Sequence, residues 1–292
     1  MNSLPVLAAV DGSEHSLRAL EWALDAARSR DAELLVVHVR PDYARVRAPH
    51  EYYPPLPEGP GDPVLDGVRE LLAGRAGLPP VRYDAPTGTP AAVLAELSGR
   101  ARMVVLGSRG RGGFASLLLG STGRSLSAHA ACPVVVVTHG CEPAPPVPDA
   151  RRVVLGLDPR ETDDEVVAFA FAEAERRGAD LDVVSTYLVP LSALLPVGTA
   201  AEPSAPEAEL ARAQAERLRP YAERSPVTVR YAVAPGDAAG RLVTASEDAS
   251  LVVVGRHRRR LTPGSLALGS TANAVLLHGH CPVVVVPPAK ER

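Results

Sequence analysis

Short apolar runs alternate with longer segments of helical periodicity along the whole chain. In the first half, the apolar runs lie near residues 4–10, 33–39, 79–84, 102–107 and 133–138. Apolar residues recur at helical spacing between these runs, over residues 14–29, 62–76, 88–100 and 120–131. The runs are rich in valine and leucine on both faces, which is typical of parallel strands covered by helices on both sides. The alternation predicts an α/β fold, a doubly wound parallel sheet with right-handed crossovers.

The second half of the chain repeats the first. Its apolar runs lie near residues 152–157, 181–187, 227–233, 250–255 and 282–287. LGSTGRSLSAHAACPVVVV at 119–137 matches LGSTANAVLLHGHCPVVVV at 268–286, and VLAAVDGS at 6–13 matches VVLGLDPR at 153–160. Because order and spacing persist from the first strand to the last, the pattern indicates a tandem duplication. We therefore predict two domains of five strands each, over residues 1–140 and 151–292.

A proline-rich segment separates the two copies. HGCEPAPPVPDA at 139–150 contains four prolines, which favour extended backbone and exclude helix. Residues 141–150 are therefore predicted to form a short, semi-rigid linker.

Two longer proline-rich segments, 40–63 and 189–206, each follow the second strand of a copy. Loops of this length often cover a binding site, and these leave the sheet at the edge where open α/β sheets bind ligands. A tolerated surface insertion is the alternative, because lengthening a loop costs little free energy.

The composition agrees with two globular domains and excludes several classes of protein. Of the 292 residues, 46% are hydrophobic and 22% are charged. The net charge of −3 argues against nucleic acid as a partner. No run approaches the roughly 18 apolar residues of a membrane span, and the N-terminus lacks the basic region of a signal peptide. We therefore expect a cytoplasmic protein without membrane contact.

The cysteine and lysine content excludes further kinds of site. Three cysteines without a CxxC pair argue against a disulfide framework or a structural zinc site. Lys290 is the only lysine, which excludes a P-loop lysine and a Schiff-base lysine in the body of either domain.

A glycine-rich segment after the fourth strand of the first copy carries the most informative chemistry. It contains glycines, hydroxyl side chains and arginines, at Gly107, Arg109, Gly110, Arg111, Gly120, Ser121 and Thr122. Glycine lets backbone N–H groups approach a ligand closely, and successive amides at a helix N-terminus attract anions. The segment suits a polyphosphate, and a glycine-rich loop without a ligand is the alternative.

The spacing is neither that of a Walker A loop, which needs GxxxxGK[ST], nor that of a dinucleotide fingerprint in the first strand-to-helix turn. It resembles the nucleotide motif of the universal stress protein family, in which GxxG is followed by nine residues and G[ST]. The chain is also similar to that family in Asp11 after its first strand, His38-Val39 after its second, the Gly88-Thr89-Pro90 turn and the closing CPVVVV strand. The similarity covers both copies, so the chain resembles a tandem-type universal stress protein.

This resemblance implies flavodoxin-like, or Rossmann-like, sheets of strand order 3-2-1-4-5 with ATP at their carboxyl edge. Asp11 would contact the nucleoside, Val39 would hydrogen-bond adenine through its backbone, and the glycines with Ser121 would surround the phosphates. Mg²⁺ would be held by the phosphates rather than by a protein cage. The candidate ATP-binding residues are Ala9, Asp11, Gly12, Val39, Gly107, Ser108, Arg109, Gly110, Arg111, Gly120, Ser121 and Thr122.

The second copy departs from the motif. Arg258 replaces the second motif glycine, and Pro263 removes an amide donor from the middle of the loop. A weaker second site would use the residues that remain, Asp158, Gly255, Gly269 and Ser270. Either this half has lost ATP and serves as a structural partner, or the basic run 256–260 holds an anion by charge.

The resemblance implies an ATP-binding regulatory protein of the stress response, whose nucleotide occupancy changes its conformation or its partner contacts. No residue set offers a dedicated base or nucleophile, so we expect no enzymatic activity beyond a slow ATPase. Two alternatives are a nucleotide-free interaction scaffold and an enzyme that cleaves ATP between its α and β phosphates.

The last strand of each copy indicates how the two domains associate. Residues 133–138 and 282–287 lie at a sheet edge in the order 3-2-1-4-5, where an unpaired apolar strand favours aggregation. We therefore expect these strands to pair within the chain across a pseudo-two-fold axis. A homodimer, or an unknown protein partner, is expected in addition.

Overall fold

The computed structural model describes residues 4–41, 61–110, 119–138, 152–187, 205–256 and 268–289. The chain divides into two compact units, Met1–Val137 and Thr138–Arg292. The predicted linker 141–150 and most of the two long proline-rich segments lie outside the described residues.

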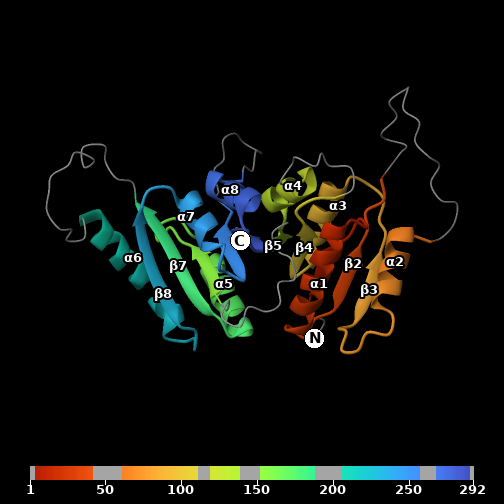
Figure 1. The fold of residues 1–292 in the computed structure, drawn as a ribbon, viewed down its shortest axis with the longest axis horizontal. Helices are drawn as coiled ribbons and strands as arrows, with labels where there is room; N and C mark the ends of the chain where they lie inside the picture. Colours follow the sequence, from red (N-terminus) through yellow and green to blue (C-terminus); the bar gives the residue numbers. More distant parts are fainter. Residues whose placement is uncertain are drawn as a thin grey trace, which may run out of the picture. The chain divides into compact units, whose positions relative to one another are not determined.

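The first unit alternates strands and helices, drawn in red to yellow-green in Figure 1. Its elements are β1 (Val6–Ala9), α1 (Glu14–Arg28), β2 (Leu34–Val37), α2 (Pro63–Leu72), β3 (Val81–Asp84), α3 (Pro90–Leu97), a 3₁₀ turn (Ser98–Arg100), β4 (Met103–Gly107), α4 (Ser121–His129) and β5 (Val134–Val137). The strands are all parallel, in the order β3-β2-β1-β4-β5. Both the order and the parallel pairing confirm the predicted fold class.

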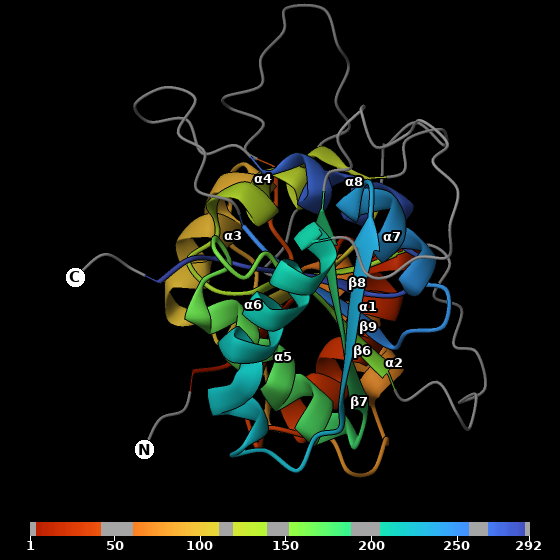
Figure 2. The same ribbon diagram turned by 90° about the vertical axis from the view of Figure 1, so that its left-hand side faces the viewer.

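The second unit has the same topology. Its elements are β6 (Arg152–Gly156), α5 (Asp164–Arg177), β7 (Asp180–Tyr187), α6 (Ala205–Ala222), β8 (Val229–Pro235), α7 (Ala238–Ala245), β9 (Leu251–Gly255), α8 (Ser270–His278) and β10 (Val283–Val286). The order is β8-β7-β6-β9-β10, again all parallel. Figure 2 shows α5 and α6 on one side of β7 and β8, with α7 on the other. None of the described helices is both long and apolar enough to cross a membrane.

Aliphatic side chains build both cores, as the scarcity of aromatic residues requires. Leu7, Leu20 and Leu24 are fully buried in the first unit, and Leu155 and Leu181 in the second. All four valines of β5 are buried, as are those of β10. β5 and β10 therefore carry apolar side chains on both faces, as parallel strands between two helical layers do, whereas β3 and β8 are only partly buried.

Capping side chains and backbone angles determine where the helices begin and end. The Ser13 side chain accepts a hydrogen bond from the Ser16 amide at 3.2 Å, which caps the start of α1. α2 ends at Leu72, four residues before the predicted end, because Ala73 leaves the helical region and Gly74 follows with φ +75°. The predicted helix 88–100 is divided into α3 and the 3₁₀ turn.

Two helical leucines of the first unit differ in how much of the side chain is exposed. Leu24 on α1 is 1% exposed, whereas Leu71 on α2 is 44% exposed. We expect Leu24→Ala to lower the free energy of unfolding by about 2–5 kcal/mol, because it leaves a cavity in the core. Leu71→Ala is the matched control and should change it by less than about 0.5 kcal/mol. Urea titration of the full chain measures both, and equal losses would contradict the assigned core.

Candidate functional site

The candidate site of the first unit lies where β1 and β4 end side by side. The two strands are neighbours in the sheet, and the chain leaves them in opposite directions across it, toward β2 from β1 and toward β5 from β4. This is the topological switch point, where open α/β sheets bind ligands. Asp11 follows β1 and Gly107 is the last residue of β4, so the fold brings two predicted site residues to one crevice.

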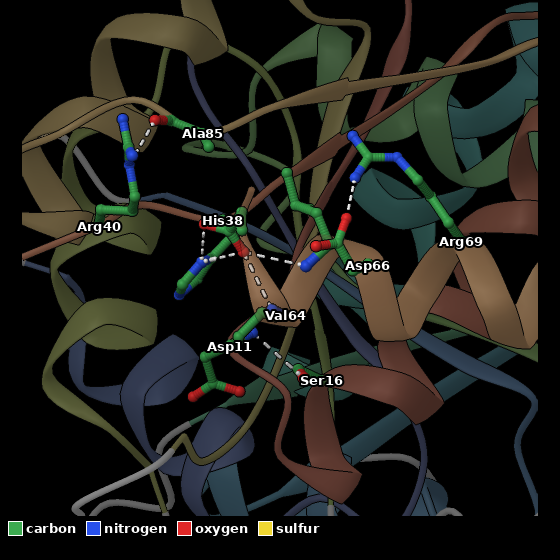
Figure 3. Close-up of polar contacts among 10 residues, drawn as sticks. Asp11, Ser16, His38, Arg40, Val64, Asp66, Arg69 and Ala85 are labelled. Carbon is green, nitrogen blue, oxygen red and sulfur yellow. Dashed lines mark hydrogen bonds and ion pairs between the residues drawn. The ribbon is translucent and has the colours of Figure 1, made fainter. Parts of the chain in front are cut away.

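Asp11 is held by the turn that begins α1. Its Oδ1 accepts hydrogen bonds from the Ser13 amide at 3.0 Å and from the Ser13 hydroxyl at 2.6 Å. Its own amide donates to Ser16 Oγ at 3.3 Å (Figure 3). The carboxylate therefore stays fixed at the end of β1, because three groups of the same turn hold its residue.

Two glycines of the motif are required by close packing. A Cβ on Gly107 would lie 2.6 Å from the carbonyl oxygen of His15, in the first turn of α1. A Cβ on Gly110 would overlap Asp11 Oδ2. Only glycine lets the segment after β4 approach α1 and Asp11 this closely.

The helix that follows the glycine segment has an open N-terminus. Gly120 is the N-cap of α4 and has no side chain to bond the first amides of the helix. Its own amide donates to the carbonyl oxygen of Ser108 at 2.8 Å, which ties the start of α4 to the end of β4. Ser121 and Thr122 are the first two helical residues. The amides of its first turn, which no described side chain caps, and the positive end of the helix dipole lie at the same crevice end of the sheet.

Ser108 adds a buried hydroxyl beside this helix start. The residue is 2% exposed, and its Oγ has no hydrogen-bond partner among the described residues. Its amide donates to the Val137 carbonyl oxygen at 3.0 Å, so the backbone is fixed while the hydroxyl is not satisfied. Such a group is rare in folded proteins and indicates a missing partner.

The backbone of Val39 likewise has polar groups without a hydrogen-bond partner among the described residues. Val39 is buried just beyond β2, yet none of the described residues makes a hydrogen bond to its amide or carbonyl. Its neighbours His38 and Arg40 both donate from their amides, to Asp84 and Pro86 respectively. Buried backbone groups are almost always paired, so this one is suited to a ligand.

The sequence did not reveal the pairing of His38 with Asp62. The carboxylate of Asp62 lies 2.8–2.9 Å from His38 Nδ1, which therefore donates to it. Asp62 also caps α2, because its Oδ1 accepts from the amides of Val64 and Leu65 at 3.1 and 3.0 Å. The contact fastens α2 to the end of β2, next to the open backbone of Val39. Aspartate followed by Pro63 is a helix-start signal that could have revealed the cap.

In the second unit, side chains of α6 contact the turn after β6 and the end of β7, which correspond to the ends of β1 and β2. The strand registers align Tyr187 with Arg40, and the Tyr187 hydroxyl donates to Glu207 of α6 at 3.2 Å. Arg160, in the turn after β6, forms an ion pair of 2.8 Å with Glu209 of the same helix. α6 has 18 residues, whereas α2 has 10. The added turns of α6 thus contact both the β6–α5 turn and the end of β7.

A buried glutamine of α6 also contacts the end of β7. Gln214 of α6 is fully buried and donates to Ser185 Oγ at 3.0 Å and to the Val183 carbonyl oxygen at 3.1 Å. Ser185 stands at the position of His38 and donates to the Leu157 carbonyl oxygen at 2.7 Å. Ser185 and Gln214 Nε2 are therefore satisfied within the protein, whereas Gln214 Oε1 has no hydrogen-bond partner among the described residues.

Asp158 and Arg256 show what remains of the motif in the second unit. Asp158 accepts from the Arg160 amide at 2.9 Å, much as Asp11 accepts from Ser13. Arg256 occupies the position of Ser108, is half-buried, and has a pKa that burial lowers from its usual value. α8 still begins after Gly269 without a side-chain cap, at Ser270.

The structure thus brings most of the predicted residues of the first unit to one end of one sheet. Arg111 and residues 112–118 lie outside the described residues, as does the run 257–267 of the second unit. Among the residues described, no group of three or more histidine, cysteine, aspartate or glutamate side chains is placed to hold a metal ion.

Comparison with known families decides the membership of the chain. The model of the Universal stress protein family matches twice, over residues 4–138 and 150–287. The chain belongs to the universal stress protein family. Its two matches coincide with the two structural repeats, so it is a tandem member of that family.

Known universal stress proteins match the chain over nearly their whole length. Universal stress protein Rv2005c of Mycobacterium tuberculosis is 36% identical over 297 residues, which cover 96% of each chain. Universal stress protein Rv1996 of the same species is 33% identical over 313 residues, covering 97% of this chain and 95% of that protein. The crystal structure of a universal stress protein from Archaeoglobus fulgidus shares the fold with a TM-score of 0.64, at 18% identity and with 99% and 97% of the two chains covered.

The His38–Asp62 contact predicts a pH dependence of stability. Burial acts to raise the pKa of Asp62, but the Leu65 amide, His38 and the Val64 amide outweigh it and hold the pKa below its usual value of 3.8. Since the pKa is lower in the folded state, the carboxylate stabilises the protein above the unfolded pKa, and this contribution is lost as pH falls through the folded value. We expect the unfolding free energies of wild type and Asp62→Asn, measured in urea, to converge below pH 3.8.

Asp62→Ala separates the cap from the charge. Asparagine caps a helix about as well as aspartate, whereas alanine does not, so Asp62→Ala should cost about 1 kcal/mol more than Asp62→Asn at neutral pH. A parallel pH dependence of wild type and Asp62→Asn would contradict the role assigned to the charge.

Proposed function

We propose that this universal stress protein binds ATP in its first half and acts as a regulatory protein in the stress response. The observation that carries the proposal is the close approach of the glycine segment to α1 and Asp11, next to an uncapped α4. Backbone that is packed this tightly and still leaves amides free is suited to bind phosphates.

The phosphates would be bound without lysine. The amides of Gly107, Gly110 and the first turn of α4 supply donors, and Arg109 with Arg111 supplies charge. The hydroxyls of Ser108, Ser121 and Thr122 complete the set of donors. We propose that Mg²⁺ binds through the phosphate oxygens, since a hydrated ion of this kind is often held by a nucleotide's phosphates.

The nucleoside would bind between the ends of β1 and β2. Asp11, with Ala9 and Gly12 beside it, would contact the sugar, and the open backbone of Val39 would hydrogen-bond the adenine edge. The His38–Asp62 contact supports this, because it fixes the backbone next to Val39. Binding would alter the conformation or the partner contacts of the protein, with little or no hydrolysis.

The second half is proposed to be the partner that does not respond to ATP. Asp158, Gly255, Gly269 and Ser270 remain from a second site, but α6 extends to the turn after β6, where Glu209 pairs with Arg160 at the surface, and its Gln214 is buried against Ser185. This favours loss of ATP in that half over anion binding by its basic run. We further propose that the two halves pair through residues 133–138 and 282–287, and that the whole chain forms a homodimer or binds another protein.

Glycine positions at the two helix starts test this asymmetry. Gly120 has φ −72° and Gly269 has φ −58°, values that any residue adopts, so a side chain is tolerated by the backbone at both. Gly120→Glu places a carboxylate among the phosphates and should weaken ATP binding by about 100-fold or more, equal to about 2.7 kcal/mol. The matched control Gly269→Glu should leave affinity unchanged in calorimetric titration. Equal losses in both variants would contradict the asymmetry.

Two further measurements separate the alternatives. Mass spectrometry of the denatured, purified protein should reveal co-purified ATP, whereas its absence together with no calorimetric signal would favour the nucleotide-free scaffold. Release of pyrophosphate from ATP in the presence of acceptors would instead favour an enzyme that cleaves between the α and β phosphates.

A further inference from the structure

The first unit has a groove at the end of the sheet opposite the nucleotide crevice. It has a volume of about 320 Å³ and opens over β2 and β3 beside the end of α3. Several of its residues precede β1 and β4, so it lies toward the amino ends of these strands. The residues that matter for its chemistry are Pro5, Leu35, Leu97, Arg82, Arg100 and Asp84.

The groove combines an apolar floor with two arginines. Leu35 and Leu97 are half-buried and face it from β2 and α3. Arg82 projects from β3, and its Nε donates to Glu33 at 2.7 Å, which leaves its other nitrogen atoms free to bind. Arg100 is exposed, and no hydrogen bond or ion pair joins it to any other described residue.

The acidic residue of the groove is separated from this positive end. Asp84 lies two residues after Arg82 on β3, which places it about 7 Å farther toward the carboxyl end of the strand. Arg100 precedes β4 and thus lies at the amino end. A ligand carboxylate is therefore favoured at the amino end of the groove, near the arginines.

The second unit carries carboxylates at the same place. Its strand registers align Arg230 with Arg82 and Asp182 with Leu35. Asp182 forms ion pairs of 3.5 Å with Arg230 and 3.4 Å with Arg152. Arg230 also pairs with Asp180 at 2.5 Å, as Arg82 pairs with Glu33, so Arg230 has two carboxylate partners where Arg82 has one.

The two units differ at a second position of this surface. Asp248 stands at the position of Arg100, and it lies 3.1 Å from Arg152. Where the second unit has two aspartates, the first unit therefore has a leucine and an unpaired arginine. The amino end of this surface therefore has two arginines and one carboxylate, Glu33, in the first unit, but two arginines and three aspartates in the second.

We propose that the groove binds an acidic, extended segment of a partner protein. Aliphatic side chains of the segment would pack on Leu35 and Leu97, while its carboxylates would pair with Arg82 and Arg100. β3 is the edge strand of this sheet in the described part of the chain, so the segment lies within reach of free backbone donors and acceptors. The surface is separate from the ATP crevice, so the proposal does not depend on nucleotide binding.

A labelled peptide tests the proposal on the full chain. The probe is a peptide of alternating glutamate and leucine, about eight residues long, and glutamine replaces glutamate in the comparison peptide. Fluorescence anisotropy at about 0.15 M salt should show binding of the acidic peptide and an affinity about tenfold lower for the glutamine peptide. Equal affinity for the two peptides, or no binding of either, would overturn the proposal.

Variants taken from the second unit locate the binding. Leu35→Asp and Arg100→Asp introduce the aspartates found there and should each weaken binding of the acidic peptide about tenfold, or about 1.4 kcal/mol. Arg230→Gln alters the equivalent arginine of the second unit and should leave the affinity unchanged. If Leu35→Asp unfolds in circular dichroism, the exposed Arg100→Asp decides alone, and unchanged binding there would refute the assignment. Displacement of the peptide by octanoate at equal affinity would identify a site for free carboxylates and overturn the peptide assignment.

Discussion

The contact between Gly107 and the carbonyl oxygen of His15 is the constraint on which the candidate site depends. Because no side chain separates them, the end of β4 lies directly against the first turn of α1. That approach brings the segment after β4 to Asp11, and the bond from the Gly120 amide to Ser108 then fixes where α4 begins. One close contact between two backbone segments therefore sets the positions of an acid, a glycine segment and a helix start.

Much of the fold could be predicted because local and global signals agree. Valine runs and helical spacing identified the strands and helices, and the matching CPVVVV strands indicated the duplication. The strand order and the parallel pairing confirm both, and the family match confirms the tandem type. Helix ends were less predictable, since the end of α2 depends on the backbone angles of Ala73 and Gly74.

The site was only partly predictable, because its remaining features depend on residues far apart in sequence. His38 and Asp62 are separated by a long proline-rich segment, and no local pattern couples them. Gln214 was missed for another reason, since glutamine in a helix is usually exposed and only the fold reveals its burial. The orphan hydroxyl of Ser108 likewise follows from packing, not from composition.

The internal polar network around Gln214 has a thermodynamic consequence for the whole chain. A ligand raises the stability of a folded state by an amount that grows with the logarithm of its concentration, but only for the part that binds it. Among the described residues, Ser108 Oγ and the Val39 backbone of the first unit have no hydrogen-bond partner, whereas the second unit satisfies Ser185 and Gln214 Nε2, though not Gln214 Oε1, from its own residues. The proposed binding would thus make the stability of the first half depend on the supply of a small molecule, whereas that of the second half would not.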